Sequence, residues 1–208
     1  MKKKAILTLL FMFMCLSFCT FSSCGVDDRG NSIYLYDPLD DYGFIADGLA
    51  FRYIGDSCKF IGVTSDKIDA TEIVIPASVE DPKTKESISV TRIEKESNDF
   101  YVKKCNPISY CKNLVSVKIS STVTSVSYDF FSDCNKLEKI EVDENNKNYF
   151  SENGILYGRY YDGGIEIVQV PRGISGEISI SRAVTRVRQY AFSGCTEITK
   201  ITIPDSVT

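Results

Sequence analysis

Aliphatic residues recur at fixed distances from three cysteines, Cys111, Cys134 and Cys195. The residues three, six and eight positions after each cysteine are Leu114, Val117, Ile119, Leu137, Ile140, Val142, Ile198, Ile201 and Ile203. The residues three positions before the cysteines are Ile108, Phe131 and Phe192. The last two copies also share valines further upstream, namely Val123, Val126, Val184 and Val187. Nine aliphatic matches out of nine, in a chain with 43% hydrophobic residues, indicate an internal repeat.

The spacing and alternation of this repeat predict its architecture. Cys111 and Cys134 are 23 residues apart, within the period of about 20–29 residues of leucine-rich repeats. The alternating, β-branched segments 115–119, 137–142 and 198–203 predict strands. Segments such as 191–195 are too short for a stable helix and predict turns. We therefore predict an α/β repeat, mostly β. It is a leucine-rich-repeat solenoid with a parallel sheet on one wall, short turns or helical turns opposite, and hairpin inserts.

One pair of repeat cysteines is too far apart for a regular winding. The stretch from Cys134 to Cys195 is more than two and a half times as long as the stretch from Cys111 to Cys134. It contains strand-like runs at 165–170 and 178–180, together with the segment 154–157. We interpret the additional length as further, irregular windings and not as a separate domain.

The repeat sequence resembles a known family. Segments 184–195 and 201–208 are similar to the BspA-like leucine-rich repeat of bacterial surface lipoproteins. The resemblance implies that segment 148–157 is a family insert, 73–79 another strand-plus-proline copy, and 43–65 an N-terminal hairpin cap. It covers about residues 43–208, with interruptions at 80–89 and 94–107, and the last repeat is incomplete at Thr208.

The N-terminus has the pattern of an export signal. Three lysines, Lys2 to Lys4, precede an uncharged apolar stretch and the small residues Ser22 and Ser23. Phe21 to Cys24 resembles the lipobox of bacterial lipoproteins, in which the cysteine becomes the lipidated N-terminus. We expect a lipoprotein signal peptide over 1–23 and, over 24–42, the lipidated Cys24 and an acidic tether. A membrane-spanning anchor over 5–21 is the alternative, weakened by polar residues and minimal length.

Cleavage at this site changes the charge of the working molecule. Removal of 1–23 takes three lysines and no acid, so the net charge of the remaining chain falls from −4 to −7. An acidic chain lacks the basic footprint of a nucleic-acid-binding protein, and we predict no nucleic-acid partner. The predicted location is the outer-membrane cell surface of a Gram-negative bacterium. There the chain contacts the membrane through the lipid on Cys24.

Composition argues against an enzyme. The chain has no histidine, which removes the commonest general base and metal ligand. The segment 143–148 starts like a calcium loop, but Lys147 stands at a ligand position and Asn148 at the glycine position. We predict no catalytic residue, no metal site and no cofactor. A hydrolase that uses two carboxylates is the remaining enzymatic alternative.

The repeat register separates a core from a surface. We expect a structural core ladder formed by Cys111, Cys134, Cys195, Phe131 and Phe192. A disulfide framework is the alternative for these cysteines, and a bridge between Cys58 and Cys105 stays open. The outward strand positions give a candidate binding face: Ser116, Lys118, Lys139, Glu141, Lys200 and Thr202.

These features together predict a surface binding module. The expected ligand is a protein or glycan, and the family resemblance implies adhesion to host extracellular matrix or to other cells. The alternative is a structural or accessory envelope lipoprotein that binds a neighbouring envelope component.

Overall fold

The computed structural model describes residues 24–26, 32–34, 43–95 and 107–208. The predicted signal peptide over 1–23, most of the tether and Cys105 lie outside these residues. Strands β1 (Cys24–Val26) and β2 (Ser32–Tyr34) pair antiparallel. The described chain is made of strands, turns and two short 3₁₀ turns, η1 (Ser65–Lys67) and η2 (Pro107–Tyr110). The described part contains no helix long and apolar enough to span a bilayer.

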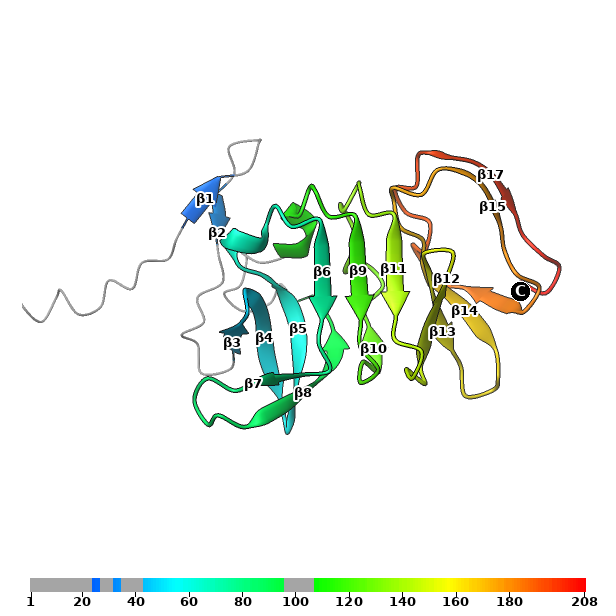
Figure 1. The fold of residues 1–208 in the computed structure, drawn as a ribbon. Helices are drawn as coiled ribbons and strands as arrows, with labels where there is room; N and C mark the ends of the chain where they lie inside the picture. The colour runs from blue at the N-terminus through cyan, green and yellow to red at the C-terminus, as the bar shows by residue number, and fades with distance from the viewer. Residues whose placement is uncertain (1–23, 27–31, 35–42, 96–106) are drawn as a thin grey trace, which may run out of the picture.

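A parallel sheet forms one wall of the fold, as the repeat predicts. Its strands, in the order β11-β9-β6, are β6 (Glu72–Ile75), β9 (Ser116–Ile119) and β11 (Lys139–Val142). Figure 1 shows the three strands side by side and pointing the same way. Ile73, Val117 and Ile140 share one row and are buried, because alternate residues of a strand face the same side. The solenoid architecture predicted from the sequence is confirmed.

The segment 43–65, predicted as an N-terminal hairpin cap, contains three strands. Strands β3 (Gly43–Ala46), β4 (Leu49–Ile54) and β5 (Ser57–Val63) form an antiparallel meander. Asp47 and Gly48 have φ of 50° and 75°, the conformation that two-residue hairpin turns require. Beyond β5 the sheet continues with β8 (Ser87–Ile93), which is parallel to β5, and β10 (Ser125–Val126), which is parallel to β8. Strand β7 (Ser78–Glu80) pairs antiparallel with β8.

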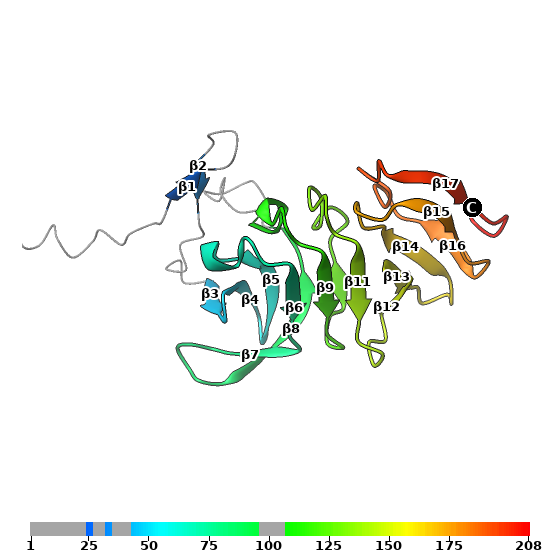
Figure 2. The same ribbon diagram turned by 45° about the horizontal axis from the view of Figure 1, so that its top comes forward.

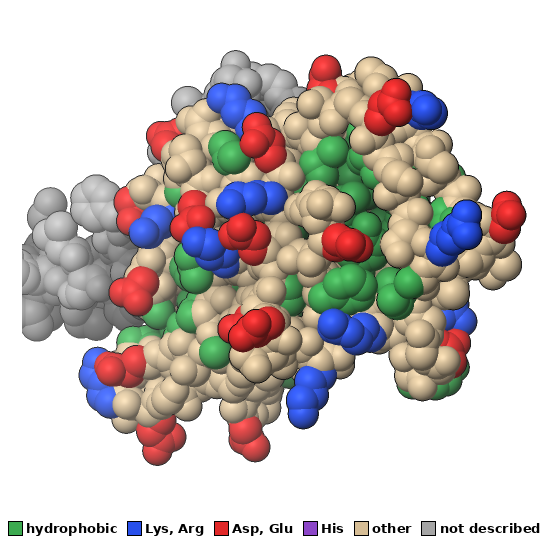
Figure 3. Space-filling view, turned by 45° about the vertical axis from the view of Figure 1, so that its right-hand side comes forward, with side chains coloured by type: hydrophobic (Ala, Val, Ile, Leu, Met, Phe, Trp, Pro, Cys, Tyr) green, Lys and Arg blue, Asp and Glu red, His purple; other side chains and the backbone are tan. Residues whose placement is uncertain are grey.

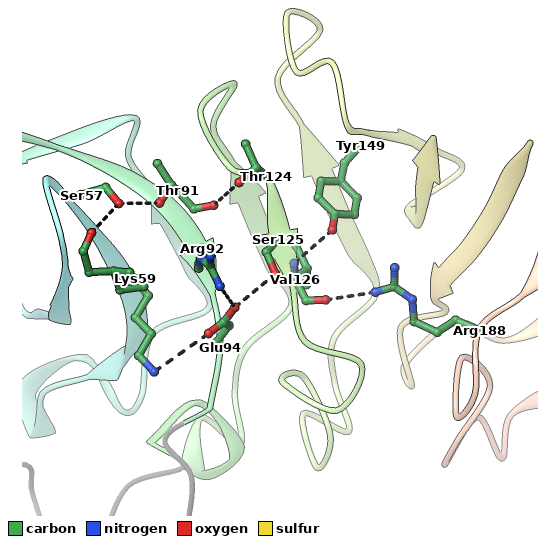
Figure 4. Close-up of polar contacts among 11 residues, drawn as sticks. Ser57, Lys59, Thr91, Arg92, Glu94, Thr124, Ser125, Val126, Tyr149 and Arg188 are labelled. Atoms are coloured by element: carbon green, nitrogen blue, oxygen red, sulfur yellow. Dashed lines mark hydrogen bonds and ion pairs between the residues drawn. The ribbon is translucent and has the colours of Figure 1, made fainter. Parts of the chain in front are cut away.

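Polar side chains connect the strands of this second sheet (Figure 4). Thr91 Oγ1 donates to Ser57 Oγ at 3.0 Å, and Thr124 Oγ1 donates to the Thr91 carbonyl at 3.1 Å. Glu94 lies 4.0 Å from Lys59 Nζ and accepts a hydrogen bond from Ser125 Oγ at 3.2 Å. The contacts repeat across β5, β8 and β10, so that each winding is tied to the next by side chains as well as by backbone.

The stretch between Cys134 and Cys195 is largely antiparallel. Strands β12 (Tyr149–Glu152), β13 (Ile155–Arg159) and β14 (Ile165–Gln169) form consecutive antiparallel pairs, and β16 (Val184–Val187) pairs parallel with β14. The predicted hairpin insert is therefore present. The windings resume with β15 (Gly176–Ser179) and β17 (Ile198–Thr202), which form a separate parallel pair (Figure 2).

The hairpin closes the outer edge of β11. Ile140 N donates to Gly154 O at 2.9 Å, and Val142 N donates to Ser151 Oγ at 3.0 Å. Gly154 has φ of 80°, and a Cβ there would lie 2.9 Å from Glu138 O, so the turn requires glycine. Because these groups occupy the edge of β11, the parallel sheet of β6, β9 and β11 ends there. We call this sheet the front sheet.

The core has two parts along the solenoid. The larger contains Cys111, Phe131 and Cys134, each at most 2% exposed. The smaller lies between the insert and β15–β17, and Phe192 and Cys195 are only partly buried against it. Their winding has a neighbour on one side only, since β17 lies at the end of the fold in Figure 1. Of the predicted core ladder, Cys111, Phe131 and Cys134 thus lie in the central core, whereas Phe192 and Cys195 lie at the margin of the smaller core.

Candidate functional site

The exposed side of the front sheet carries two register-paired rows. Glu72, Ser116 and Lys139 form one row, and Val74, Lys118 and Glu141 form the next. We call these six residues the front face. Four of them, Ser116, Lys118, Lys139 and Glu141, come from the candidate face predicted from the sequence.

Opposite charges pair across this face. Lys118 Nζ lies 3.0 Å from Glu72 Oε2, and Lys139 Nζ lies 2.9 Å from Glu141 Oε1. The hydrogen bond from Lys118, and to a lesser extent the one from Ser116, lowers the pKa of Glu72. The same contact with Glu72 raises the pKa of Lys118. All four charged side chains are 43–48% exposed. Exposed pairs of this kind contribute little to stability, so the charges are available to a partner.

Ser116 does not present its side chain outward, contrary to expectation. It is only 5% exposed, and its Oγ donates to Glu72 Oε2 at 3.1 Å. The cause is its position in the row, because the short serine lies between the longer Glu72 and Lys139. Ser116 therefore orients Glu72 and is not itself a contact surface.

Lys200 and Thr202 are exposed on a different sheet. Both lie on β17, where Lys200 Nζ is 3.2 Å from Glu177 Oε2 of β15. The six residues of the predicted candidate face therefore lie on two separate sheets, because β17 pairs with β15 and the hairpin occupies the edge of β11.

Sequence reasoning missed two members of the front face, Glu72 and Val74. Both lie on β6, whose winding has no cysteine at the repeat position. Aligning Ile73 and Ile75 with Val117 and Ile119 would have found them, since these pairs share the sheet register. Val74 is 51% exposed and supplies an apolar contact amid the charges.

A shallow groove runs along one end of the front face. It has a volume of about 470 Å³ and is lined by residues that include Val74, Pro76, Lys118, Glu141 and Asp143. Figure 3 shows acidic and basic side chains interspersed on this side of the molecule, with hydrophobic side chains gathered beside them. Such a mixture suits recognition of a protein surface better than chemistry on a small substrate.

Four cysteines of the described chain are reduced thiols with raised pKa values. Burial raises the pKa of Cys58, Cys111 and Cys134 to about 12, and it also raises the pKa of Cys195. The thiol form therefore dominates at neutral pH, whereas nucleophilic cysteines need a lowered pKa. No disulfide framework joins these four cysteines.

The segment that starts like a calcium loop is an asparagine-centred turn. Asn146 is 3% exposed, and its Nδ2 donates to Ser120 O at 2.9 Å and to Val123 O at 3.0 Å. Its Oδ1 accepts from the backbone N–H groups of Asn148 and Tyr149. The side chain is thus used to join two windings. Over the described ranges, no cluster of three or more potential metal ligands occurs.

Residues 106–154 and 175–208 match the family described as a BspA type leucine rich repeat region, in 6 copies. A comparison with curated proteins found no match.

Similar solved structures come from several bacteria. A leucine rich cell surface protein of Faecalibacterium prausnitzii A2-165 has 15% identity and a TM-score of 0.42, covering 79% of this chain and 71% of that one. A leucine-rich repeat protein of Bacteroides capillosus has 15% identity and a TM-score of 0.43, covering 77% and 99%. The leucine rich repeat protein of T. pallidum has 17% identity and a TM-score of 0.40, covering 79% and 62%.

Proposed function

We propose that the protein is a non-enzymatic binding module that recognises a protein partner through its front face. The match of residues 106–154 and 175–208 to the BspA type leucine rich repeat region supports this proposal. The exposed members of the front face, Glu72, Val74, Lys118, Lys139 and Glu141, carry this proposal, because they set two unlike charge pairs around an exposed valine. Extended sheet faces of solenoids are used in this way.

The partner is defined by the charge pattern it must match. The two lysines and two glutamates cancel, so the face does not select a strongly acidic or basic surface. It favours a partner with interspersed charges and an apolar side chain that reaches Val74 and the adjoining groove. Charge complementarity of this kind sets specificity and association rate more than affinity.

We further propose that the module acts at the cell surface, held by lipid on Cys24. The supporting observation is the sequence alone: a basic start, an apolar stretch and a cysteine after small residues. A surface binding module of this kind would serve adhesion to host matrix or to other cells.

The binding proposal is tested with purified protein lacking residues 1–23 and a panel of matrix proteins, mucin and intact cells. We expect at least one partner to bind, and Val74→Asp combined with Lys118→Glu to weaken that binding by about 10-fold or more. The substitutions lie on an exposed face, so the fold should persist, as circular dichroism would verify.

The matched control is Lys85→Glu, which makes the same charge change as Lys118→Glu but in the turn between β7 and β8. Lys85 is 70% exposed and pairs with Glu80 at 3.4 Å, so its loss should change neither fold nor binding. Binding that Lys85→Glu weakens as much as the front-face variant does would show a general charge effect and contradict the proposal. Recovery of envelope components alone after cross-linking on cells would contradict adhesion.

A further inference from the structure

We propose that the protein also has a saccharide-binding pocket, walled by Tyr128 and Tyr190, for a neutral sugar unit of a glycan. The pocket lies in the turns that follow β10 and β16, away from the strands that carry the front face. It is a site additional to the protein-binding function and does not depend on it.

The insert creates the space for this pocket. Tyr128 and Tyr190 lie in equivalent turns, each leading to a repeat cysteine, Cys134 or Cys195. The chain between these two cysteines is longer than a single winding, and Gln169, at the end of β14, lines the pocket together with residues of both turns. A cavity of about 340 Å³ results, within the usual size range of small-ligand sites.

Arg172 holds the two turns at a fixed separation. Its Nη1 donates to Asp133 Oδ1 and Asn135 Oδ1, each at 3.1 Å, and its Nε donates to Ser193 O at 3.1 Å. The side chain passes so close to Gly194 that any Cβ there would collide with it. The arginine thus joins the turn of one repeat to the turn of the next, which pre-organises the cavity between them.

The two tyrosines form an exposed aromatic wall. Their ring centroids are 5.8 Å apart with an interplanar angle of 32°, and the residues are 50% and 56% exposed. Tyr190 has φ of 64°, an unfavourable conformation for a bulky residue, and such strain gathers at binding sites. Tyr190 combines an unfavourable backbone conformation with a side chain that is more than half exposed, so it contributes little to core packing. Contact with a ligand explains this arrangement better than a role in the core does.

The polar lining suits a neutral, hydroxyl-rich ligand. Asp129, Ser132, Gln169 and Ser193 supply a carboxylate, an amide and two hydroxyls. Lys95 Nζ lies 2.7 Å from Asp129 Oδ2 and donates to Ser132 Oγ at 3.1 Å. Because this ion pair balances the carboxylate, the pocket does not select a charged ligand.

Gln169 offers its amide oxygen, and not its amide nitrogen, to a ligand. It is 6% exposed, and its Nε2 donates to Val170 O at 3.0 Å and to Ala191 O at 3.5 Å. With Nε2 engaged, Oε1 is the atom that the amide can offer to a sugar hydroxyl. The weakly positive C–H bonds on the apolar face of a pyranose ring would then meet the negative faces of the tyrosine rings.

The proposal is tested on purified protein lacking residues 1–23, with chitotriose, maltotriose and N-acetyllactosamine as separate probes. Saturation-transfer NMR and titration calorimetry should detect binding of at least one of them, with a dissociation constant of about 1 mM or tighter. We expect Tyr128→Ala and Tyr190→Ala each to weaken that binding by about 10-fold, whereas Tyr190→Phe, which keeps the ring, should retain it.

Two control variants separate this site from other surfaces. Tyr161→Ala removes a fully exposed tyrosine from the turn between β13 and β14 and should leave sugar binding unchanged. The front-face variant Lys118→Glu should also leave it unchanged, so that failure of one proposal is distinguishable from failure of the other.

Three results would overturn the proposal. One is no detectable binding of any of the three saccharides at about 10 mM. Another is binding that persists in the Tyr128→Ala, Tyr190→Ala double variant while circular dichroism shows an intact fold. The last is saturation of the pocket by a proline-rich peptide with no competition from any saccharide, which would assign the pocket to a protein partner.

Discussion

At the residue scale, a repeat position predicts burial well and surface exposure less well. Cys111, Phe131 and Cys134 are core residues, as expected, because the apolar pattern reflects packing inside one winding. Ser116 is buried despite its outward register, since exposure depends on the lengths of Glu72 and Lys139 beside it. Those neighbours belong to other windings, and a pattern read within one copy does not include them.

The burial of the cysteines leads to a prediction about thiol reactivity. Burial raises the pKa of Cys58, Cys111 and Cys134 to about 12, and alkylation requires the accessible thiolate. We expect iodoacetamide at about pH 8 to label Cys195 faster than these three in the folded protein. Peptide mapping by mass spectrometry measures the rates, with urea-unfolded protein as the control. Labelling of Cys111 or Cys134 as fast as Cys195 would contradict the structure.

At the element scale, strand positions could be predicted from the sequence but part of their pairing could not. The predicted segments 115–119, 137–142 and 198–203 are strands β9, β11 and β17, within two residues at their ends. The additional length between Cys134 and Cys195 was interpreted as irregular windings, yet β12, β13 and β14 in this stretch pair antiparallel. Period-2 alternation is the same for both kinds of pairing. Only turn residues such as Asn153–Gly154 distinguish them.

The insert also leaves β10 without a strand on one side. Two side chains take the place of that strand: Val126 N donates to Tyr149 Oη at 3.1 Å, and Arg188 Nη1 donates to Val126 O at 3.0 Å (Figure 4). Arg188 also forms a 2.7 Å ion pair with Glu166, whose side chain is 7% exposed. Arg188 therefore links the second sheet, the insert and the winding of β16.

Loss of Arg188 should destabilise this junction. Arg188→Ala leaves Glu166 buried without its cation and Val126 O without its donor, and we expect a loss of about 2 kcal/mol in the free energy of unfolding. Urea denaturation followed by circular dichroism measures the change. The matched control is Arg186→Ala, whose pair with Asp162 is exposed and whose loss should cost less than about 1 kcal/mol. An equal loss in the free energy of unfolding for the two variants would contradict the stabilising role of the Arg188 contacts.

At the scale of the whole molecule, the insert divides one solenoid into two stacks with separate cores. This division places the front face on the first stack and the tyrosine pocket at the boundary, where Arg172 crosses from one stack to the other. The sequence predicted a solenoid because apolar periodicity records nearest-neighbour stacking. It did not predict the boundary, because a boundary depends on how an irregular segment packs against two regular ones.

The position of Cys24 sets how such a molecule would stand on a membrane. Nineteen residue steps separate Cys24 from Gly43, where the meander begins, so a fully extended tether would span at most about 65 Å. That reach would place the N-terminal meander nearest the bilayer and leave both binding surfaces accessible to a partner. Acyl chains on Cys24 would supply the attachment, since two or more chains hold a protein stably.

Replacement of the proposed lipidated residue tests this arrangement directly. In bacteria that express the protein, Cys24→Ala should abolish incorporation of radiolabelled fatty acid and either release the protein into the medium or leave an uncleaved precursor. Cys195→Ala, which removes a thiol from the folded domain, is the control and should remain lipidated and cell-associated. Unchanged fatty-acid incorporation in Cys24→Ala would mean that the chain is held at the membrane in another way. The orientation derived from the tether would then no longer follow.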